Sequence, residues 1–435
     1  MHICRRWRRI VFSSQRSLHL RLFCTPGTPV LETLSLWPAL PIVVQYGGSL
    51  VSNPPVPEDE DNVMAALKQS NRVDSISLTV TKPLLKRLSA IRRTFSELEN
   101  LVLLCGDDIP LTVSSKLSSA FRWGPRLRNL HLSRVAIPAL PRLLFLSTAL
   151  VDLQLHEISN VGYITPEAFA SALSGMSHLQ ILSLHFLSSA PYPDFVRLPP
   201  PSERATLLSL RKLKYQGTSE YLDSLAARID APQLGNIGIT FQPPPMERPQ
   251  FGEFINRIGM QKYHRRADIL FSQNTASISF TQPDSLTCLR LQVSCESFSL
   301  QLDVMTRICA GLYSFRCGIE HLRLCAAPAN GYHYRWENLL NLFRGTKWAY
   351  VTPGILTDII HALQHPGYPG MKEGESLLPV LHKLCIQNPN TTPSVQKAVL
   401  SFMHSRLLSG HVIAVEYDRL RTKEPHGTGT PLSQC

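Results

Sequence analysis

One six-residue pattern of apolar residues recurs along most of this chain of 435 residues. Each copy reads apolar-x-x-apolar-x-apolar, and seven of the nine spacings between successive copies are 23 to 33 residues long. A unit of this length cannot bury its apolar face alone, so it must stack on its neighbours. The pattern therefore predicts a repeat architecture. The copies begin at Val73, Leu98, Leu127, Leu150, Leu179, Leu210, Leu234, Leu286, Ile319 and Leu381.

The spacing inside each copy predicts the local structure. The last two apolar residues alternate with polar residues, which places them on one face of a short strand. The first apolar residue enters the same core from the preceding turn, and the segment between copies has room for a helix and two turns. We therefore expect an α/β fold over residues 63–420. It is a leucine-rich-repeat-like solenoid with a parallel sheet on the concave side and helices on the convex side.

The segments between copies contain helix signals. Thr165-Pro166 combines a capping residue with a proline at the first helical position, and Thr392-Pro393 does the same. Ser219 opens another segment whose apolar residues have helical spacing. Gly410 is expected to end the helix that starts at Pro393, and residues 411–416 are expected to form a final strand.

The array is expected to be irregular. The copies at Leu234 and Leu286 are separated by double the usual spacing. Two strand-like runs in this gap, 267–271 and 276–280, predict a hairpin in place of one unit. Residues 346–351 are expected to form another degenerate unit.

Composition narrows the class of protein. Hydrophobic residues make up 44% of the chain and charged residues 17%, which is typical of a folded protein. No apolar run approaches the ~18 residues that a membrane-spanning helix requires, so we predict no membrane segment. The ten cysteines form no Cys-x-x-Cys pair, and their irregular gaps favour buried thiols over a zinc site or disulfides. This usage suits a reducing compartment, cytoplasmic or nuclear.

The formal net charge of +12 is concentrated at the start of the chain. The remaining basic excess is diffuse and is not interleaved with aromatic residues, so we predict that nucleic acid is not a partner. The first 25 residues contain no acidic residue, a composition that is also typical of a mitochondrial presequence. A mitochondrial protein therefore stays open as an alternative. The six arginines concerned are Arg5, Arg6, Arg8, Arg9, Arg16 and Arg21.

The start of the chain and several internal segments resemble a known family. His2–Phe12 looks like the closing helix of an F-box, with its Cys-x-x-Trp core at Cys4 and Trp7. Segments 36–42, 163–168 and 408–411 are similar to a large fungal family of F-box proteins with leucine-rich repeats. The resemblance spans almost the whole chain.

The resemblance implies a modular adaptor. In such proteins the F-box binds a Skp-type adaptor within a cullin-based SCF ubiquitin ligase, and the repeats hold a protein substrate. Residues 1–25 would then be the remnant of the F-box closing helix, with Cys4, Trp7 and Val11 as the adaptor-binding remnant. Residues 26–62 would be a linker and 421–435 a disordered tail. Because the earlier F-box helices are missing, a repeat scaffold with no ligase link is the alternative.

The chain lacks the usual short motifs of catalysis. It has no Gly-x-x-x-x-Gly-Lys phosphate loop and no Gly-x-Ser-x-Gly elbow, and His156-Glu157 lacks the second histidine of a zinc protease helix. We therefore predict a protein that is not an enzyme and that uses no cofactor and no metal.

The expected partner-binding face consists of the polar residues that alternate with the buried leucines. In the C-terminal copies these residues are basic, and we take as a hypothesis that they face an acidic or phosphorylated segment of a protein partner. The N-terminal candidates are Asn100, Asn129, His131, Asp152 and Gln154, and the C-terminal ones are Lys212, Lys214, Arg290, His321, Arg323 and Lys383.

Overall fold

The computed structural model is an α/β structure with a large, mostly parallel sheet. The chain divides into two compact units, Met1–Met260 and Gln261–Cys435, which are described separately. The structure describes residues 5–6, 13, 20–24, 29–36, 40–47, 57–91, 93–105, 111–112, 122–123, 125–137, 140–187, 204–242, 249–258, 264–281, 288–316, 318–326, 335–364, 376–387 and 393–418.

The sheet of the first unit is parallel throughout its described part, with strand order β1-β2-β3-β5-β8-β10-β11-β13-β15. Most of these strands coincide with copies of the apolar pattern. The strands are β1 (Leu20–Phe23), β2 (Ile42–Tyr46), β3 (Val73–Val80), β5 (Asn100–Cys105), β8 (Asn129–Ser133), β10 (Asp152–Ile158), β11 (Ile181–Phe186), β13 (Lys212–Gly217) and β15 (Asn236–Phe241). Short pairs join β4 (Thr94–Phe95) to β7 (Arg122–Trp123), β6 (Leu111–Thr112) to β9 (Val135–Ala136) and β12 (Ala205–Thr206) to β14 (Ile229–Asp230).

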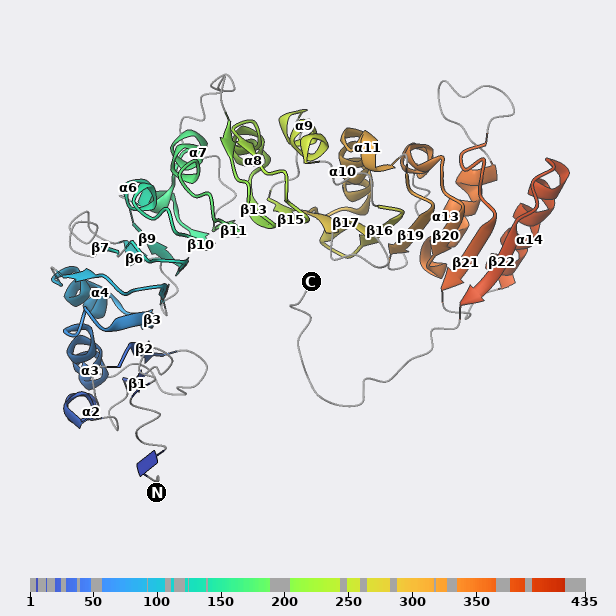
Figure 1. Ribbon diagram of the computed structural model, residues 1–435. Helices are drawn as coiled ribbons and strands as arrows, with labels where there is room; N and C mark the ends of the chain where they lie inside the picture. Colours follow the sequence, from blue (N-terminus) through green and yellow to red (C-terminus); the bar gives the residue numbers. More distant parts are fainter. Residues whose placement is uncertain are drawn as a thin grey trace. The chain divides into compact units, whose positions relative to one another are not determined.

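Helices of the first unit lie along one side of its strands (Figure 1). Neighbours along the chain pack side by side, α6 against α7, α7 against α8 and α8 against α9. Thr165 caps α7 as predicted, accepting a hydrogen bond from the Ala168 N–H at 3.3 Å. The helices are α2 (Val30–Leu36), α3 (Pro57–Leu67), α4 (Lys82–Ser89), α6 (Leu140–Phe145), α7 (Pro166–Leu173), α8 (Ser219–Ala226) and α9 (Pro249–Arg257), with a 3₁₀ turn η2 (Asn160–Gly162).

The second unit begins with antiparallel strands. β18 pairs with β17 and β17 with β16 in the antiparallel sense, and β16, β19, β20, β21 and β22 follow in parallel. The predicted hairpin is therefore confirmed, and a strand, β20, lies where a degenerate unit was predicted at 346–351. The elements are β16 (Arg266–Phe271), β17 (Thr275–Thr281), β18 (Cys288–Ser294), β19 (His321–Ala326), β20 (Trp348–Val351), β21 (Lys383–Gln387), β22 (Ala414–Asp418), α10 (Phe298–Gly311), α11 (Tyr313–Arg316), α12 (Glu337–Leu340), η4 (Asn341–Phe343), α13 (Pro353–Gln364) and α14 (Pro393–Leu408).

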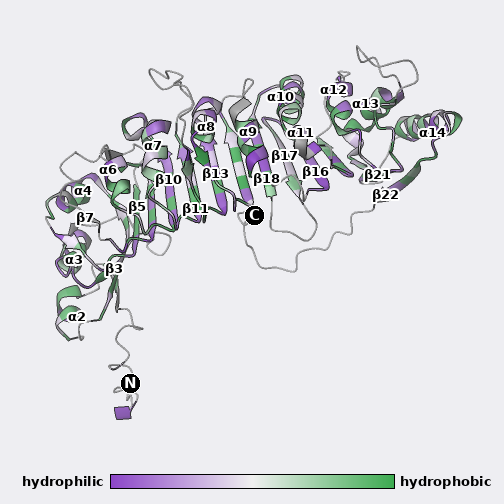
Figure 2. Ribbon diagram, turned by 45° about the horizontal axis from the view of Figure 1, so that its top comes forward, coloured by the Kyte–Doolittle hydropathy of each residue, from purple (hydrophilic) through white to green (hydrophobic). Residues whose placement is uncertain are grey.

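Most of the longer strands bury one face and leave the other half-buried or exposed. In β10, Leu153 and Leu155 are 0% and 2% exposed, and Leu150 enters the same core from the preceding turn. Asp152 and Gln154 lie on the opposite face and are half-buried. Figure 2 shows hydrophobic and hydrophilic residues alternating along such strands. Burial of a leucine side chain stabilises the fold by about 1.5–3 kcal/mol, so the stacked leucines hold the strands in register.

The final strand starts later than the sequence predicts. Gly410 ends α14 with a φ of 78°, and the His411 N–H then donates to the carbonyl of Arg406 at 2.9 Å. This helix-ending hydrogen bond takes up the backbone that was expected to start the strand, so β22 begins at Ala414. The sheet also starts earlier than the repeat pattern, because β1 and β2 precede the first copy.

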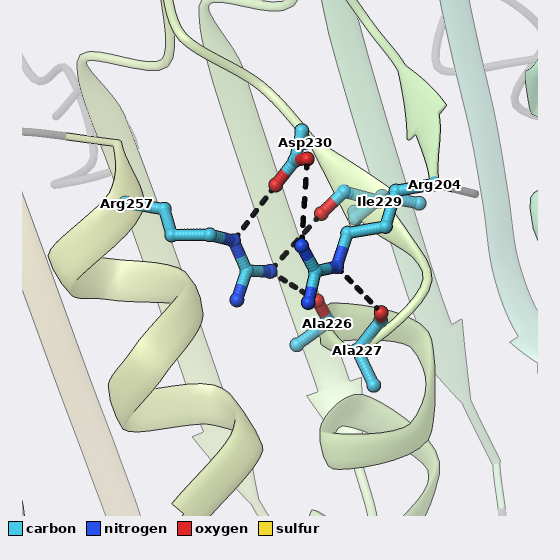
Figure 3. A network of polar contacts seen from close by, with 6 residues as sticks. All are labelled: Arg204, Ala226, Ala227, Ile229, Asp230 and Arg257. Carbon is cyan, nitrogen blue, oxygen red and sulfur yellow. Dashed lines mark hydrogen bonds and ion pairs between the residues drawn. The ribbon is translucent and has the colours of Figure 1, made fainter. Parts of the chain in front are cut away.

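A network of two arginines and one aspartate connects α9 to the end of α8 (Figure 3). Arg257 of α9 donates from Nε to Asp230 Oδ1 at 2.7 Å and from Nη2 to the carbonyl of Ala226 at 2.9 Å. Arg204 donates from Nε to the carbonyl of Ala227 at 3.1 Å. The last carbonyls of a helix have no partner within it, and the guanidinium groups supply those partners here.

Removal of one buried leucine from β13 tests the stacking model. Leu213→Ala is expected to lower the free energy of unfolding by about 2–5 kcal/mol, because the side chain is fully buried between neighbouring repeats. Gln216→Ala, on the other face of the same strand, is the matched control and should change it by less than about 0.5 kcal/mol. Urea unfolding followed by circular dichroism measures both. Equal losses would contradict the division of the strand into two faces.

Neutralising the aspartate of the arginine network tests whether it holds α9 in place. Asp230→Asn is expected to speed amide exchange at Phe254 and Ile255 of α9 about 5- to 30-fold, which corresponds to about 1–2 kcal/mol. The control is Asp303→Asn, which breaks an exposed pair within α10, Asp303 with Arg307 at 2.7 Å. Such a pair contributes only about 0.5 kcal/mol. Unchanged exchange in α9 would show that packing alone holds the helix.

Candidate protein-binding face

The described helices lie on the side of the buried leucines, so the residues that alternate with those leucines form the other face of each sheet. In the first unit the strand register places Asn100, Asn129, Asp152 and Lys212 in one row, with Ile181 before Lys212. A second row contains Val102, His131, Gln154, Ser183 and Lys214. The structure therefore brings the predicted N-terminal candidates together with Lys212 and Lys214.

Side-chain contacts connect members of these rows. Asn129 Nδ2 donates to Asn100 Oδ1 at 2.5 Å, and Gln154 Nε2 donates to both carboxylate oxygens of Asp152 at 3.0 and 3.1 Å. Burial raises the pKa of Asp152, and the hydrogen bond from Gln154 opposes that rise. The amide of Gln154 thus stabilises the carboxylate form of Asp152.

Three histidines cluster on this face. The rings of His131 and His156 are 4.8 Å apart between centroids, and those of His156 and His185 are 6.1 Å apart. His156 Nε2 also forms a hydrogen bond with Ser183 Oγ at 2.9 Å. Only His131 was a sequence candidate. His156 and His185 follow the last leucine of their copies and continue the alternation by one position, which is the signal that could have found them.

The histidines are neutral at pH 7. Burial is the largest cause that lowers the pKa of His156 to about 4; the neighbouring His131, His185 and Lys214 add to this effect in that order, and Glu157 opposes it. Burial also lowers the pKa of His131 and of His185. The positive charge of this face in the first unit therefore comes from Lys212 and Lys214, which form no ion pair within the described residues.

A bulge at the end of β10 positions this cluster. The register between β10 and β11 shifts between Leu155 and Ile158, and Glu157 adopts a φ of 53°. Arg134, at a φ of 57°, lies beside it, where its Nε donates to a carboxylate oxygen of Glu157. A positive φ is uncommon outside glycine. Arg134 and Glu157 both adopt one, and their side chains form an ion pair with each other.

In the second unit the strand register aligns two predicted candidates, His321 and Lys383, in one row with an aromatic and a basic residue. This row, here called the cation–aromatic row, consists of Arg266, His321, Trp348 and Lys383 on β16, β19, β20 and β21. The rings of His321 and Trp348 are stacked, with centroids 4.3 Å apart and planes 12° apart. Trp348 and Arg266 were not among the sequence candidates, although the degenerate unit at 346–351 already indicated a strand at Trp348.

A second row lies next to it and contains Arg290, Ser279, Asp268, Arg323, Tyr350, Cys385 and Glu416. Tyr350 extends the aromatic surface, with its ring centroid 6.3 Å from that of His321. Arg323 Nη2 donates to Gln387 Oε1 at 3.1 Å, and its buried Nε has no hydrogen-bond partner. Arg290 lies on β18 and is exposed, away from the aromatic residues.

Two ion pairs hold cations of the row. Arg266 binds Asp268, with Nε and Nη2 both 3.0 Å from Oδ1, and Lys383 Nζ lies 2.5 Å from Glu416 Oε2. The hydrogen bond to Glu416 raises the pKa of Lys383, and the same bond lowers the pKa of Glu416. Burial lowers the pKa of His321. The row therefore presents cations on both sides of a ring pair whose histidine is neutral at pH 7.

The part of the chain that the structure describes contains no group of three histidine, cysteine, aspartate or glutamate side chains that could hold a metal ion. None of its helices is long and apolar enough to cross a membrane. The described cysteines are free thiols, and burial raises the pKa of Cys309 to about 12. Cys4, Trp7 and Val11 lie outside the described residues, as does the predicted tail at 421–435.

Comparisons with known proteins do not assign the chain. No protein-family model matches it, and no curated protein matches it.

The low pKa of His156 predicts a pH dependence of stability. Because this pKa falls from 6.5 to about 4 on folding, the unfolded chain binds more protons between these values. Stability should therefore fall as the pH drops from about 6.5 to about 4 and be unaffected by this group above that range. Ring nitrogen NMR of the chain and of His156→Gln identifies the signal and its midpoint. A midpoint near 6.5 would contradict the burial of the ring.

Proposed function

We propose that the chain is a leucine-rich-repeat-like solenoid that binds a protein partner through the face of its sheet opposite the buried leucines. We further propose that it is the substrate-recognition part of an F-box protein in an SCF-type ubiquitin ligase, located in the cytoplasm or nucleus. The chain carries out no catalytic step in this role. It would position a substrate for the ligase.

One observation carries the binding proposal: residues with no role in the core form aligned rows across neighbouring strands. Asn129, Asp152 and Lys212 share one such row, and His131, Gln154 and Lys214 share the next. Rows of polar side chains with regular spacing suit an extended segment or a complementary protein surface better than a small molecule, which binds in a concave pocket.

Repeat geometry supports the solenoid proposal. A helix layer occupies more width than a strand layer, so stacked units curve with their strands on the inner side. A concave sheet enlarges the area of contact with a partner. Strand residues that face the partner then combine their contributions over several repeats.

The ligase proposal rests on the resemblance of His2–Phe12 to an F-box closing helix. Cys4, Trp7 and Val11 are the residues proposed to contact a Skp-type adaptor. Removing residues 1–25 would also remove β1, which pairs with β2 in the sheet. Substitutions in the full chain therefore test the adaptor contact without disturbing the repeats.

Affinity purification of the tagged full chain tests both levels of the proposal. The chain is expected to co-purify with a Skp-type adaptor and a cullin, and the triple variant Cys4→Ala, Trp7→Ala, Val11→Ala should lose both proteins. The double variant Lys212→Glu, Lys214→Glu should keep the adaptor and lose substrate proteins at least about tenfold, because it reverses two charges on the proposed binding face.

The matched control for the charge reversal is Arg126→Glu, Arg128→Glu, which changes exposed residues in the turn before β8. Recovery of the same substrate proteins with the Lys212 and Lys214 variant and with wild type would contradict the proposed binding face. Absence of adaptor and cullin from the wild-type sample would overturn the ligase proposal and leave the repeat scaffold.

A further inference from the structure

We propose that the face of the second unit binds an extended segment of a partner protein that carries two acidic residues four positions apart. The segment crosses strands β16, β19, β20 and β21 along the cation–aromatic row, with one carboxylate at Arg266 and the other at Lys383. Its middle residue contacts the stacked rings of His321 and Trp348. This inference rests on the proposed protein-binding function and names the chemistry of the partner.

The spacing of the row sets the spacing of the acids. Neighbouring strands are about 4.8 Å apart, so the three steps from Arg266 to Lys383 cover about 14 Å. An extended peptide advances about 3.4 Å per residue, and alternate side chains lie on the same side. Residues at positions one and five of such a peptide are therefore also about 14 Å apart. Position three lies between them, opposite the ring pair.

The cations at the two ends already bind carboxylates of this chain. Arg266 uses Nε and Nη2 on Asp268, so its remaining guanidinium nitrogen stays available for a second acceptor. Lys383 has three donors and holds Glu416 with one of them. Both pairs are partly exposed, with side-chain exposures of 41% for Arg266 and 33% for Lys383. Exposed pairs of this kind rearrange at little cost.

Arg323 supplies a third cation in the adjacent row. Its guanidinium forms no ion pair within the described residues, and it lies on β19 between Asp268 and Tyr350. A carboxylate of the segment would give this guanidinium a charged acceptor in addition to the amide oxygen of Gln387. Among the described side chains of these strands, the cations Arg266, Arg290, Arg323 and Lys383 on this face outnumber the acids Asp268 and Glu416.

The same arrangement disfavours a nucleic acid. A nucleic acid strand would bring phosphates close to the middle steps of the row, where His321 and Trp348 provide no cation to pair with them. The rings of His321 and Trp348 are also stacked on one another, whereas base stacking needs an open ring face. A peptide places its negative charges only at the two ends.

The experiment selects ligands without assuming a sequence. A randomised heptapeptide library displayed on phage is selected against the full chain. Enriched peptides are expected to carry Asp or Glu at two positions four apart, with an aromatic or aliphatic residue midway. Affinity of the best peptide is then measured by fluorescence anisotropy for wild type and variants. Trp348→Leu and the double variant Arg266→Gln, Lys383→Gln should each weaken binding about tenfold or more.

The control variant is Arg307→Gln, which removes one positive charge from the exposed surface of α10 and should leave the affinity unchanged. His321→Gln serves as a second test of the ring pair if Trp348→Leu lowers the circular dichroism signal. Replacing either acid of the peptide by Gln, or moving the acids to positions two apart, should weaken binding to a similar extent.

Several results would overturn the inference. One is the enrichment of peptides without paired acids, and another is an equal loss of peptide affinity in the Arg307→Gln control. The others are peptide binding only when phosphoserine replaces the acids, and displacement of the peptide by a single-stranded oligonucleotide. Failure here is distinguishable from failure of the proposed function. If the wild-type chain selects no acidic peptide but the Lys212→Glu, Lys214→Glu variant still loses the substrate proteins, the protein-binding role stands. Only the site on the second unit is then overturned.

Discussion

The constraint on which the structure depends is that each repeat can bury its apolar face only against its neighbours. Leu130, Leu153, Leu182 and Leu213 occupy equivalent places in successive strands, and each is 0% or 1% exposed. Satisfying this constraint fixes the register of every strand pair. The residues between the leucines are then aligned across the sheet in rows. This alignment follows from the strand register and does not depend on contacts between those residues.

The positions of most strands follow from the sequence because the buried residues carry the signal. The hairpin of β16 and β17 was also predictable, since two apolar runs fill a gap of double length. β1 and β2 were not, because they lack a complete copy of the pattern. The start of β22 was missed by three residues because the backbone after Gly410 is used to end α14. Such a helix-ending hydrogen bond depends on local backbone geometry that apolar spacing does not record.

Part of the candidate face was predictable from the sequence, but its contacts were not. Alternation correctly assigned Asn129, His131 and Lys212 to one side of the sheet. It could not show that His131 lies 4.8 Å from His156 or that His321 stacks on Trp348, because those contacts depend on the register between repeats. The bulge at Glu157 adds a further shift that is set by its pairing with Arg134.

One face of the sheet stabilises the fold and the other is proposed to bind the partner, and this separation determines how such a protein can change its partner. A leucine on the buried face contributes about 2–5 kcal/mol to the free energy of unfolding, so folding constrains which residue can stand there. A residue on the other face contributes little, and most substitutions there change stability by less than about 0.5 kcal/mol. The face of the first unit has neutral imidazoles beside two lysines, and that of the second has stacked rings between cations. Each chemistry can therefore be altered by single substitutions while the stacked leucines keep the rows aligned.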